Sequence, residues 1–307
     1  MNKSVLITGA NVGLGKEAAR QLALIPETEK IILACRNKDK AEAAKSDLEQ
    51  MTGRNIFEIL IIDVSDEKSA ANAANELSTP VDAVVLNAGG MGGKQPGKMT
   101  PSGMTMISAT NVLGHVVLVE ALLKSNKINK TVVLASSEAA RGIKQMGMNR
   151  PALTSSSVDE FISVLDGSYF GPKLDPNQAY GHVKYVATLW MSSLAREYPN
   201  IKFVSMSPGA TSGTAVTENI PLFNKIMFKY IMMPIVMPLR GMIHGLDKGA
   251  ERYVLALNDD SYTSGGFYAS KDNKVTGPVV DQATIFPDLG NAQYQDNAAK
   301  AIRTFIN

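Results

Sequence analysis

The chain has 307 residues, and its 31 lysines and arginines against 29 aspartates and glutamates give a formal net charge of +2. This near-balance argues against a dedicated nucleic-acid-binding protein, which usually carries a strong basic excess on one face. The length suits one large α/β domain or two small ones, and 45% hydrophobic residues can supply a full core. Cys35 is the single cysteine, which excludes an intrachain disulfide and a site with several cysteine ligands.

Targeting and metal-binding patterns are also absent from the sequence. The apolar run at 5–7 is too short for a signal peptide and is typical of a buried strand. The most membrane-like stretch, 231–239, contains two prolines and is far shorter than the roughly 20 apolar residues that span a bilayer. The three histidines have no ligand-like spacing. We therefore expect a cytoplasmic protein with no integral membrane segment and no metal site.

Short apolar runs alternate with helical patterns along the chain. The predicted strands are 5–8, 30–34, 57–62, 81–86, 131–135 and 202–206, with a candidate seventh at 265–269. The predicted helices are 15–24, 38–51, 69–77, about 103–124, and 178–198. Apolar strands separated by helices favour a parallel sheet that is covered on both faces. The sequence thus predicts an α/β fold, with one doubly wound domain over 1–307 and a parallel sheet of about seven strands.

Two long segments interrupt this alternation, at 141–177 and 211–245. The first is rich in glycine, proline and serine, and the second carries five methionines, two phenylalanines and a tyrosine. Both follow the carboxyl ends of strands, where open α/β sheets bind ligands, and long excursions in a compact domain are usually functional. We interpret 141–177 as an insertion and 211–245 as a substrate lid, since methionine fills irregular apolar spaces. For the methionine-rich part, 222–242, ordinary core or a docking surface is the alternative.

A glycine-rich turn lies between the first predicted strand and the first predicted helix. Gly9 permits a tight turn, Gly13 lets the backbone approach a pyrophosphate, and Gly15 allows close packing of helix and strand. The helix N-terminus then offers free N–H groups and a partial positive charge to phosphates. The spacing G-x3-G-x-G differs from the generic dinucleotide fingerprint. We expect a Rossmann-type dinucleotide site formed by Gly9, Asn11, Val12, Gly13, Leu14 and Gly15.

The residues after the second predicted strand favour NADP(H) over NAD(H). An NAD site would place a carboxylate there to accept from the ribose hydroxyls, whereas this chain has Arg36. Arg36 could hold a 2′-phosphate in a bidentate contact, with Lys16 adding to it; a solvated basic turn is the alternative. Asp63 and Val64, at the end of the third strand, could contact the adenine. The small residues that would leave room for the cofactor after the fourth strand are Asn87, Ala88 and Gly89.

Tyr180 and Lys184 lie four positions apart near the start of the predicted helix 178–198, so they share one helix face. A nearby positive charge favours the phenolate and lowers a pKa that is otherwise about 10. Tyr180 could therefore donate a proton in carbonyl reduction or accept one in alcohol oxidation. Either Ser136 or Ser137, after the fifth strand, could bind the substrate oxygen. Asn111 is a poor helix former inside a predicted helix, which indicates a specific polar role.

In combination these motifs resemble the short-chain dehydrogenase/reductase family, in order along nearly the whole chain. The matching residues are Thr8, Gly9, Gly13, Gly15, Asp63, Asn87, Ala88, Gly89, Asn111, Ser137, Tyr180, Lys184, Pro208 and Gly209. Within the family, residues 32–37, 111–115, 207–211 and 220–223 resemble the retinol dehydrogenase and protochlorophyllide reductase branch.

The resemblance implies a role for each matching residue. Tyr180 would be the general acid/base, and Lys184 would bind the nicotinamide ribose and lower the pKa of Tyr180. Ser137 would orient the carbonyl, with Ser136 the weaker candidate, and Asn111 would hold a water that links Lys184 to solvent. The implied ligands at the nicotinamide end are Pro208, Gly209 and Thr211.

Ser137 and Tyr180 are 43 positions apart, more than in the commonest members of the family. Such an insertion resembles that of carbonyl reductases and protochlorophyllide reductases, where it covers a helix face used for oligomerisation; a monomer or a dimer is expected. The leading hypothesis is an NADP(H)-dependent oxidoreductase that interconverts a carbonyl and an alcohol on a fairly large apolar substrate. The alternatives are a non-catalytic NADP(H)-binding sensor and a protochlorophyllide reductase-like enzyme that reduces a C=C bond.

Overall fold

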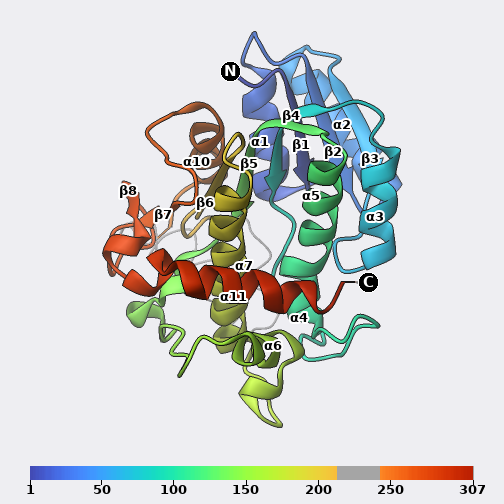
Figure 1. Cartoon of the computed structure of the whole chain (residues 1–307). Helices are drawn as coiled ribbons and strands as arrows, with labels where there is room; N and C mark the ends of the chain where they lie inside the picture. Colours follow the sequence, from blue (N-terminus) through green and yellow to red (C-terminus); the bar gives the residue numbers. More distant parts are fainter. Residues whose placement is uncertain (213–242, 307) are drawn as a thin grey trace, which may run out of the picture.

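The structure, a computed structural model, describes residues 1–212 and 243–306, and in this part of the chain one eight-stranded sheet forms the centre of an α/β fold (Figure 1). The strand order is β3-β2-β1-β4-β5-β6-β7-β8. The strands are β1 (Ser4–Thr8), β2 (Lys30–Cys35), β3 (Phe57–Ile61), β4 (Val81–Leu86), β5 (Ile128–Ala135), β6 (Lys202–Met206), β7 (Phe267–Ser270) and β8 (Val279–Asp281). The order reverses between β1 and β4, and ligands of open α/β sheets bind outside the strands' carboxyl ends at such a point.

Helices cover both faces of the sheet, as the apolar strands predict. One face packs against α1 (Gly13–Ala23), α2 (Lys38–Thr52) and α10 (Leu246–Asn258). The other face packs against α3 (Glu67–Glu76), α5 (Gly114–Lys124) and α7 (Pro176–Glu197). The central strand β4 is buried along its whole length because helices lie on both of its sides.

The sheet has eight strands rather than about seven. All neighbouring pairs from β3 to β7 are parallel, and the additional strand β8 pairs with β7 in the antiparallel direction. With only three residues, β8 is too short for its side chains to show an alternating pattern.

The long helix predicted at about 103–124 begins later and contains an irregular turn. Gly103 has a φ of 86°, in the left-handed region, and its N–H donates to the carbonyl of Thr100, so this residue belongs to a turn. The helical segment starts with α4 (Met106–Ser108), continues through a π-helical turn over Ala109–Leu113, and ends in α5. By length and composition Met106–Lys124 could cross a membrane, but 78% of its most apolar stretch is buried inside the fold, so it is weak evidence for a membrane span.

Two helices that the structure describes after residue 198 are missing from the sequence prediction. They are α10 and α11 (Ala292–Arg303), and α11 lies across the outer side of α7 (Figure 1). The buried stripe of α11 consists largely of alanines, which give only a weak hydrophobic signal. Ion pairs from Arg303 to Glu120 of α5 (2.9 Å) and to Glu197 of α7 (2.8 Å) hold its end in place.

The segment at 141–177 is less irregular than its composition suggests, because it contains α6 (Val158–Asp166). Ser157 and Glu160 cap the start of α6, and α6 packs against α7 and α11. Short 3₁₀ turns occur at Glu138–Arg141, Lys144–Met146, Ser168–Phe170, Gln282–Thr284 and Pro287–Gly290. Most of the lid predicted at 211–245, including its methionine-rich part, lies outside the described residues.

Candidate active site

The turn after β1 presents main-chain N–H groups at the carboxyl edge of the sheet. Gly9 and Gly13 have φ angles of 67° and 59°, in the region that favours glycine. A Cβ on Gly15 would lie 2.6 Å from the carbonyl oxygen of Gly9 and from Nδ2 of Asn87, so α1 approaches β4 only with glycine here. Val12 is the N-cap of α1, and no side chain in the described part of the protein caps this helix, so its first N–H groups can receive an anion. The same turn contains the other predicted ligands, Asn11 and Leu14.

Thr8 joins the end of β1 to the end of β4. Its hydroxyl accepts a hydrogen bond from the main-chain N–H of Ala88 (2.9 Å), and its carbonyl accepts one from Asn87 Nδ2 (2.9 Å). The Thr8 hydroxyl also lies 3.1 Å from Nε2 of the buried His115. Burial lowers the pKa of His115 to about 3, so the imidazole is neutral and Nε2 can accept the hydroxyl proton. These contacts hold the glycine turn against β4.

Charged residues lie at the predicted adenosine end of the edge. The Arg36 side chain is 76% exposed, and its Nη1 is 3.5 Å from Oδ2 of Asp63. Lys16 forms an ion pair with Asp47 of α2 at 2.7 Å. Ion pairs this exposed contribute little, so both cations can exchange their partner for an anionic ligand. Val64 follows Asp63, and its carbonyl accepts a hydrogen bond from the start of α5 (2.9 Å).

Asn111 lies in the π-helical turn before α5. Its Nδ2 donates to the carbonyls of Gly90 (2.7 Å) and Ile107 (2.8 Å), and its Oδ1 accepts from the N–H of Gly90 (3.2 Å). A Cβ on Gly89 would lie 2.7 Å from Asn111 Oδ1 and 3.5 Å from Lys184 Nζ, so both side chains border Gly89 and leave no room for a larger residue there. Single π-helical turns often occur at functional sites. The water-holding role remains a prediction, because the side-chain amide is engaged by Gly90 and Ile107.

The two serines after β5 point in different directions. The Ser136 hydroxyl is 2.7 Å from that of Thr188 in the core. Ser137 lies beside the hydroxyl of Tyr180 and acts on its pKa, and its Oγ accepts from the N–H of Ala139 (3.2 Å). Successive side chains of an extended segment lie on opposite sides, which accounts for the difference. Ser137 is therefore the serine that lies beside Tyr180.

Tyr180 and Lys184 lie on one face of α7, close to the end of β5. Lys184 is buried, and its Nζ donates to the carbonyl of Ala135 (2.8 Å) and lies 5.7 Å from the centre of the Tyr180 ring. Burial raises the pKa of Tyr180 to about 12; the hydrogen bond with Ser137 opposes this change, and the charge of Glu138 adds to it. Burial also lowers the pKa of Lys184 to about 8. Burial therefore sets the net direction for Tyr180, and the lowering of its pKa by protonated Lys184 stays a prediction.

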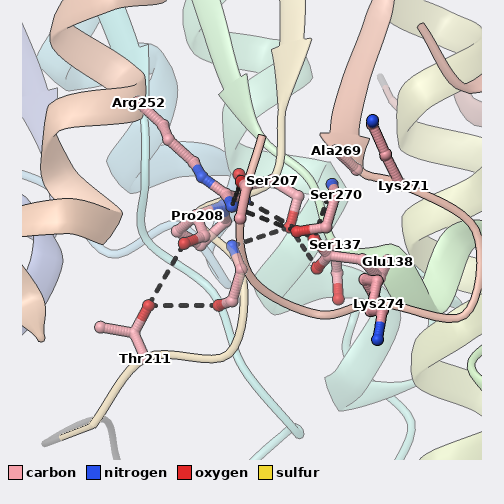
Figure 2. Close-up of polar contacts among 12 residues, drawn as sticks. Ser137, Glu138, Ser207, Pro208, Thr211, Arg252, Ala269, Ser270, Lys271 and Lys274 are labelled. Carbon is pink, nitrogen blue, oxygen red and sulfur yellow. Dashed lines mark hydrogen bonds and ion pairs between the residues drawn. The ribbon is translucent and has the colours of Figure 1, made fainter. Parts of the chain in front are cut away.

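Pro208, Gly209 and Thr211 follow β6 at the same edge (Figure 2). Gly209 has a φ of 75°, and a Cβ there would lie 2.8 Å from the carbonyl oxygen of Val275. The Thr211 hydroxyl donates to the carbonyl of Gly209 (3.1 Å), and His244 Nε2 lies 2.7 Å from the carbonyl oxygen of Pro208. These contacts place the turn against the loop that follows β7.

An apolar wall adjoins the polar groups. Ala139, Ile143 and Val275 are buried together, and Met148, Ala210 and Tyr180 pack against them. The phenol thus lies between polar partners, Ser137 and Lys184, and an apolar surface.

Glu138 and Arg252 are buried charged residues that the sequence did not single out, and they are 3% and 7% exposed. The position of Glu138 directly after Ser137 was the one local signal. Arg252 lies on a helix that was not predicted, and it gives no such signal. Among the described residues, no group of three or more His, Cys, Asp or Glu side chains could hold a metal ion. The Cys35 thiol is buried at the end of β2, which raises its pKa to about 11.

Comparison with known proteins gives matches at both the sequence and the structure level. A family model described as short chain dehydrogenase matches residues 3–149. The chain is similar to a chloroplastic protochlorophyllide reductase of Daucus carota, with 29% identity over 288 residues that cover 87% of this chain and 69% of the relative. It is also similar to retinol dehydrogenase 13 of Homo sapiens, with 36% identity over 128 residues, or 41% of this chain and 38% of the relative.

A solved structure extends the likeness of fold over most of the chain. L-sorbose reductase from Gluconobacter frateurii, crystallised with NADPH and L-sorbose, superposes with a TM-score of 0.63 and 18% identity. The match covers 90% of this chain and 97% of that one. At this identity the match shows the fold alone.

Proposed function

The chain belongs to the short-chain dehydrogenase/reductase family of oxidoreductases, and from this we propose that it is an NADP(H)-dependent enzyme that interconverts a carbonyl and an alcohol on a fairly large apolar substrate. One observation carries the proposal: Ser137 lies against the hydroxyl of Tyr180, and Lys184 Nζ lies 5.7 Å from the centre of the phenol ring and borders Gly89, which follows β4. A protein that only binds a nucleotide has no need of this arrangement.

The residues at the sheet edge fit a dinucleotide. The uncapped N-terminus of α1 would receive the pyrophosphate, and the positive φ angles of Gly9 and Gly13 leave that approach free of side chains. The exposed Arg36 would bind a 2′-phosphate in place of its partner Asp63. When NADPH is bound, its nicotinamide would supply the hydride to the carbonyl carbon.

Tyr180 would give its proton to the carbonyl oxygen. Its raised pKa, about 12, keeps the phenol protonated at neutral pH, as a proton donor requires. Ser137 can donate a hydrogen bond from its hydroxyl to the same substrate oxygen, keep its own proton and stabilise the charge that develops there. Lys184, when protonated, stabilises the phenolate that remains, and its lowered pKa, about 8, allows it to release a proton towards that phenolate.

The apolar wall supports an apolar substrate. Ile143, Val275 and Met148 belong to the same apolar cluster as Tyr180 and offer no charged group to a polar substrate. The methionine-rich segment 222–242 stays a candidate lid on the sequence alone.

Reduction of a C=C bond is the second candidate function. The match with protochlorophyllide reductase supports it, since it covers 87% of this chain. A tyrosine can donate its proton to a substrate carbon atom as well as to an oxygen atom, so the same side chains are compatible with both reactions.

The experiment is a fluorescence titration with NADPH and NADH, followed by absorbance at the nicotinamide band with a substrate panel. The panel combines long-chain aldehydes, aromatic ketones and quinones with conjugated enones. We expect tighter binding of NADPH and its oxidation by an apolar carbonyl. Turnover of the enones alone would favour C=C reduction, and NADPH binding without turnover on any member would favour the sensor.

A further inference from the structure

A buried carboxylate lies directly beside Ser137. Glu138 Oε2 accepts a hydrogen bond from the Ser207 hydroxyl (2.5 Å), and Oε1 accepts one from the main-chain N–H of Ser270 (3.2 Å) (Figure 2). Glu138 follows β5, Ser207 follows β6, and Ser270 ends β7. One carboxylate therefore ties together the carboxyl ends of three neighbouring strands.

Arg252 of α10 supplies the opposite charge. Its Nη1 lies 3.6 Å from Glu138 Oε1 and donates to the carbonyl of Ser207 (3.0 Å). Its Nη2 donates to the Ser270 hydroxyl (3.1 Å) and to the carbonyl of Gly277 (2.8 Å). Because burial of two charges costs about as much as their attraction returns, such a pair gives little net stability. Its contribution therefore lies in the geometry that it imposes.

The network reaches the reaction site from two sides. The Ser207 hydroxyl, which donates to Glu138, also accepts from the N–H of Gly209 in the turn after β6 (3.1 Å). On the other side, the residue before Glu138 is Ser137, which contacts Tyr180. A displacement of the carboxylate would move both the serine and the turn.

We propose that Glu138 is a positioning residue for the reaction, whose carboxylate, held by Arg252, sets Ser137 and the Gly209 turn relative to Tyr180. The proposal rests on the proposed function, in which Ser137 and Tyr180 bind the oxygen that gains the proton. Arg252 and Ser207 act through Glu138.

Glu138 also acts on Tyr180 through its charge, which raises the pKa of the phenol. The other titratable groups around the two residues are Arg141 of the same 3₁₀ turn, Arg252 and Tyr253 of α10, His244 before α10, and Lys184 of α7. If the negative charge is removed, the pKa of Tyr180 falls, and the phenol loses its proton at lower pH. Because reduction needs the protonated phenol, its alkaline limit then moves to lower pH, and the onset of alcohol oxidation moves the same way.

Two substitutions of Glu138 separate the effect of its charge from the effect of its side-chain length. Glu138→Gln keeps the length of the side chain and removes its charge, whereas Glu138→Asp keeps the charge and shortens the side chain by one methylene. We expect kcat to fall about tenfold or more in both, since small misplacements of reacting groups have effects of this size. Only Glu138→Gln should shift the pH profile of kcat to lower pH. NADPH affinity, measured by fluorescence, should change less than about threefold in both, because the phosphate-binding turn is untouched.

The matched control is Glu160→Gln, which makes the same chemical change at a carboxylate that accepts several hydrogen bonds in the loop before α6. It should leave kcat and the pH profile as in the wild type. Wild-type kcat with an unshifted pH profile in Glu138→Gln would overturn the proposal. So would equal losses in Glu138→Gln and Glu160→Gln.

Two further measurements keep the test decisive. If Glu138→Gln does not fold, Ser207→Ala removes the link to Gly209 by deleting one hydroxyl, and unchanged kcat in that variant would overturn the proposal. If the wild type shows no turnover, the proposed function fails, but the titration of Tyr180 can still be followed by tyrosinate absorbance with a Tyr180→Phe variant subtracted. A Tyr180 midpoint that is the same in wild type and Glu138→Gln would then count against Glu138.

Discussion

The two ends of the sheet's carboxyl edge are built in different ways. At the β1–β4 end, the main chain forms the site: Gly9, Gly13 and the uncapped start of α1. The charges there, such as Arg36, are exposed and weakly paired. At the β5–β7 end, side chains form the candidate site: Lys184 is buried and hydrogen-bonded, Tyr180 is half-buried, and both are shifted in pKa.

The two ends should differ in the effects of amino-acid substitutions. A site made of main-chain groups depends on local conformation, so a short glycine pattern in the sequence is enough to predict it. A site made of buried side chains depends on contacts between distant segments, such as that between Glu138 and Arg252. The family model matches 3–149, which contains the whole β1–β4 end and stops just after Ser137 and Glu138. Substitutions should therefore act on binding at the first end and on turnover at the second.

The largest effect is expected for Tyr180→Phe. Removal of the phenol hydroxyl takes away the proton donor, so kcat should fall by a factor of about 10³ or more. The NADPH dissociation constant, measured by fluorescence, should stay within about threefold of the wild-type value, because the phosphate-binding turn is intact.

The matched control is Tyr169→Phe, which removes the hydroxyl from another Tyr-x3-Lys sequence. The Tyr169 hydroxyl donates to the carbonyl of Ala152, in the segment 141–177, and it lies in a 3₁₀ turn rather than on α7. This variant should keep wild-type turnover. Comparable losses in both variants would remove the assignment of Tyr180 as the proton donor.

An intermediate effect is expected for Arg36→Asp at the other end. If Arg36 binds the 2′-phosphate, the reversed charge should weaken NADPH about 10- to 100-fold, in line with the loss of a charge-assisted contact. NADH, which has no 2′-phosphate, should bind as well as before or better. KM values for both cofactors measure the shift, with Arg20→Ala as a control on the outer part of α1. An unchanged ratio of the two KM values would take Arg36 out of the site.

The difference between local turns and contacts of distant segments also decides which features could be predicted from the sequence. The strands β1 to β6, the glycine turn and the Tyr180–Lys184 pair produce local patterns, and the structure has them where those patterns lie. The helix α11, the strand β8 and the buried pair of Glu138 and Arg252 produce none, because an alanine stripe, a three-residue strand and a contact across 114 positions have no local signature. The net rise in the pKa of Tyr180 could not be predicted for a related reason, since spacing on a helix does not reveal how strongly a group is desolvated.

The smallest effect, and the sharpest test of the main-chain site, comes from a pair of glycines. Gly13 and Gly53 have φ angles of 59° and 68°, and a Cβ on either would meet no atom within 4 Å among the described residues. Alanine at each position should therefore cost the same stability, about 1 kcal/mol, through the left-handed conformation alone. Thermal unfolding should show equal decreases in Tm for Gly13→Ala and Gly53→Ala.

Their nucleotide affinities should differ. Gly53 ends α2, whereas Gly13 begins α1 at the point where a phosphate would approach the N–H groups. A methyl group on Gly13 occupies that approach, so NADPH binding should weaken about tenfold in Gly13→Ala and stay at the wild-type level in Gly53→Ala. Equal affinities in the two variants would mean that the pyrophosphate does not lie over this turn, and the β1–β4 end would lose its assignment even if Tyr180 kept its own.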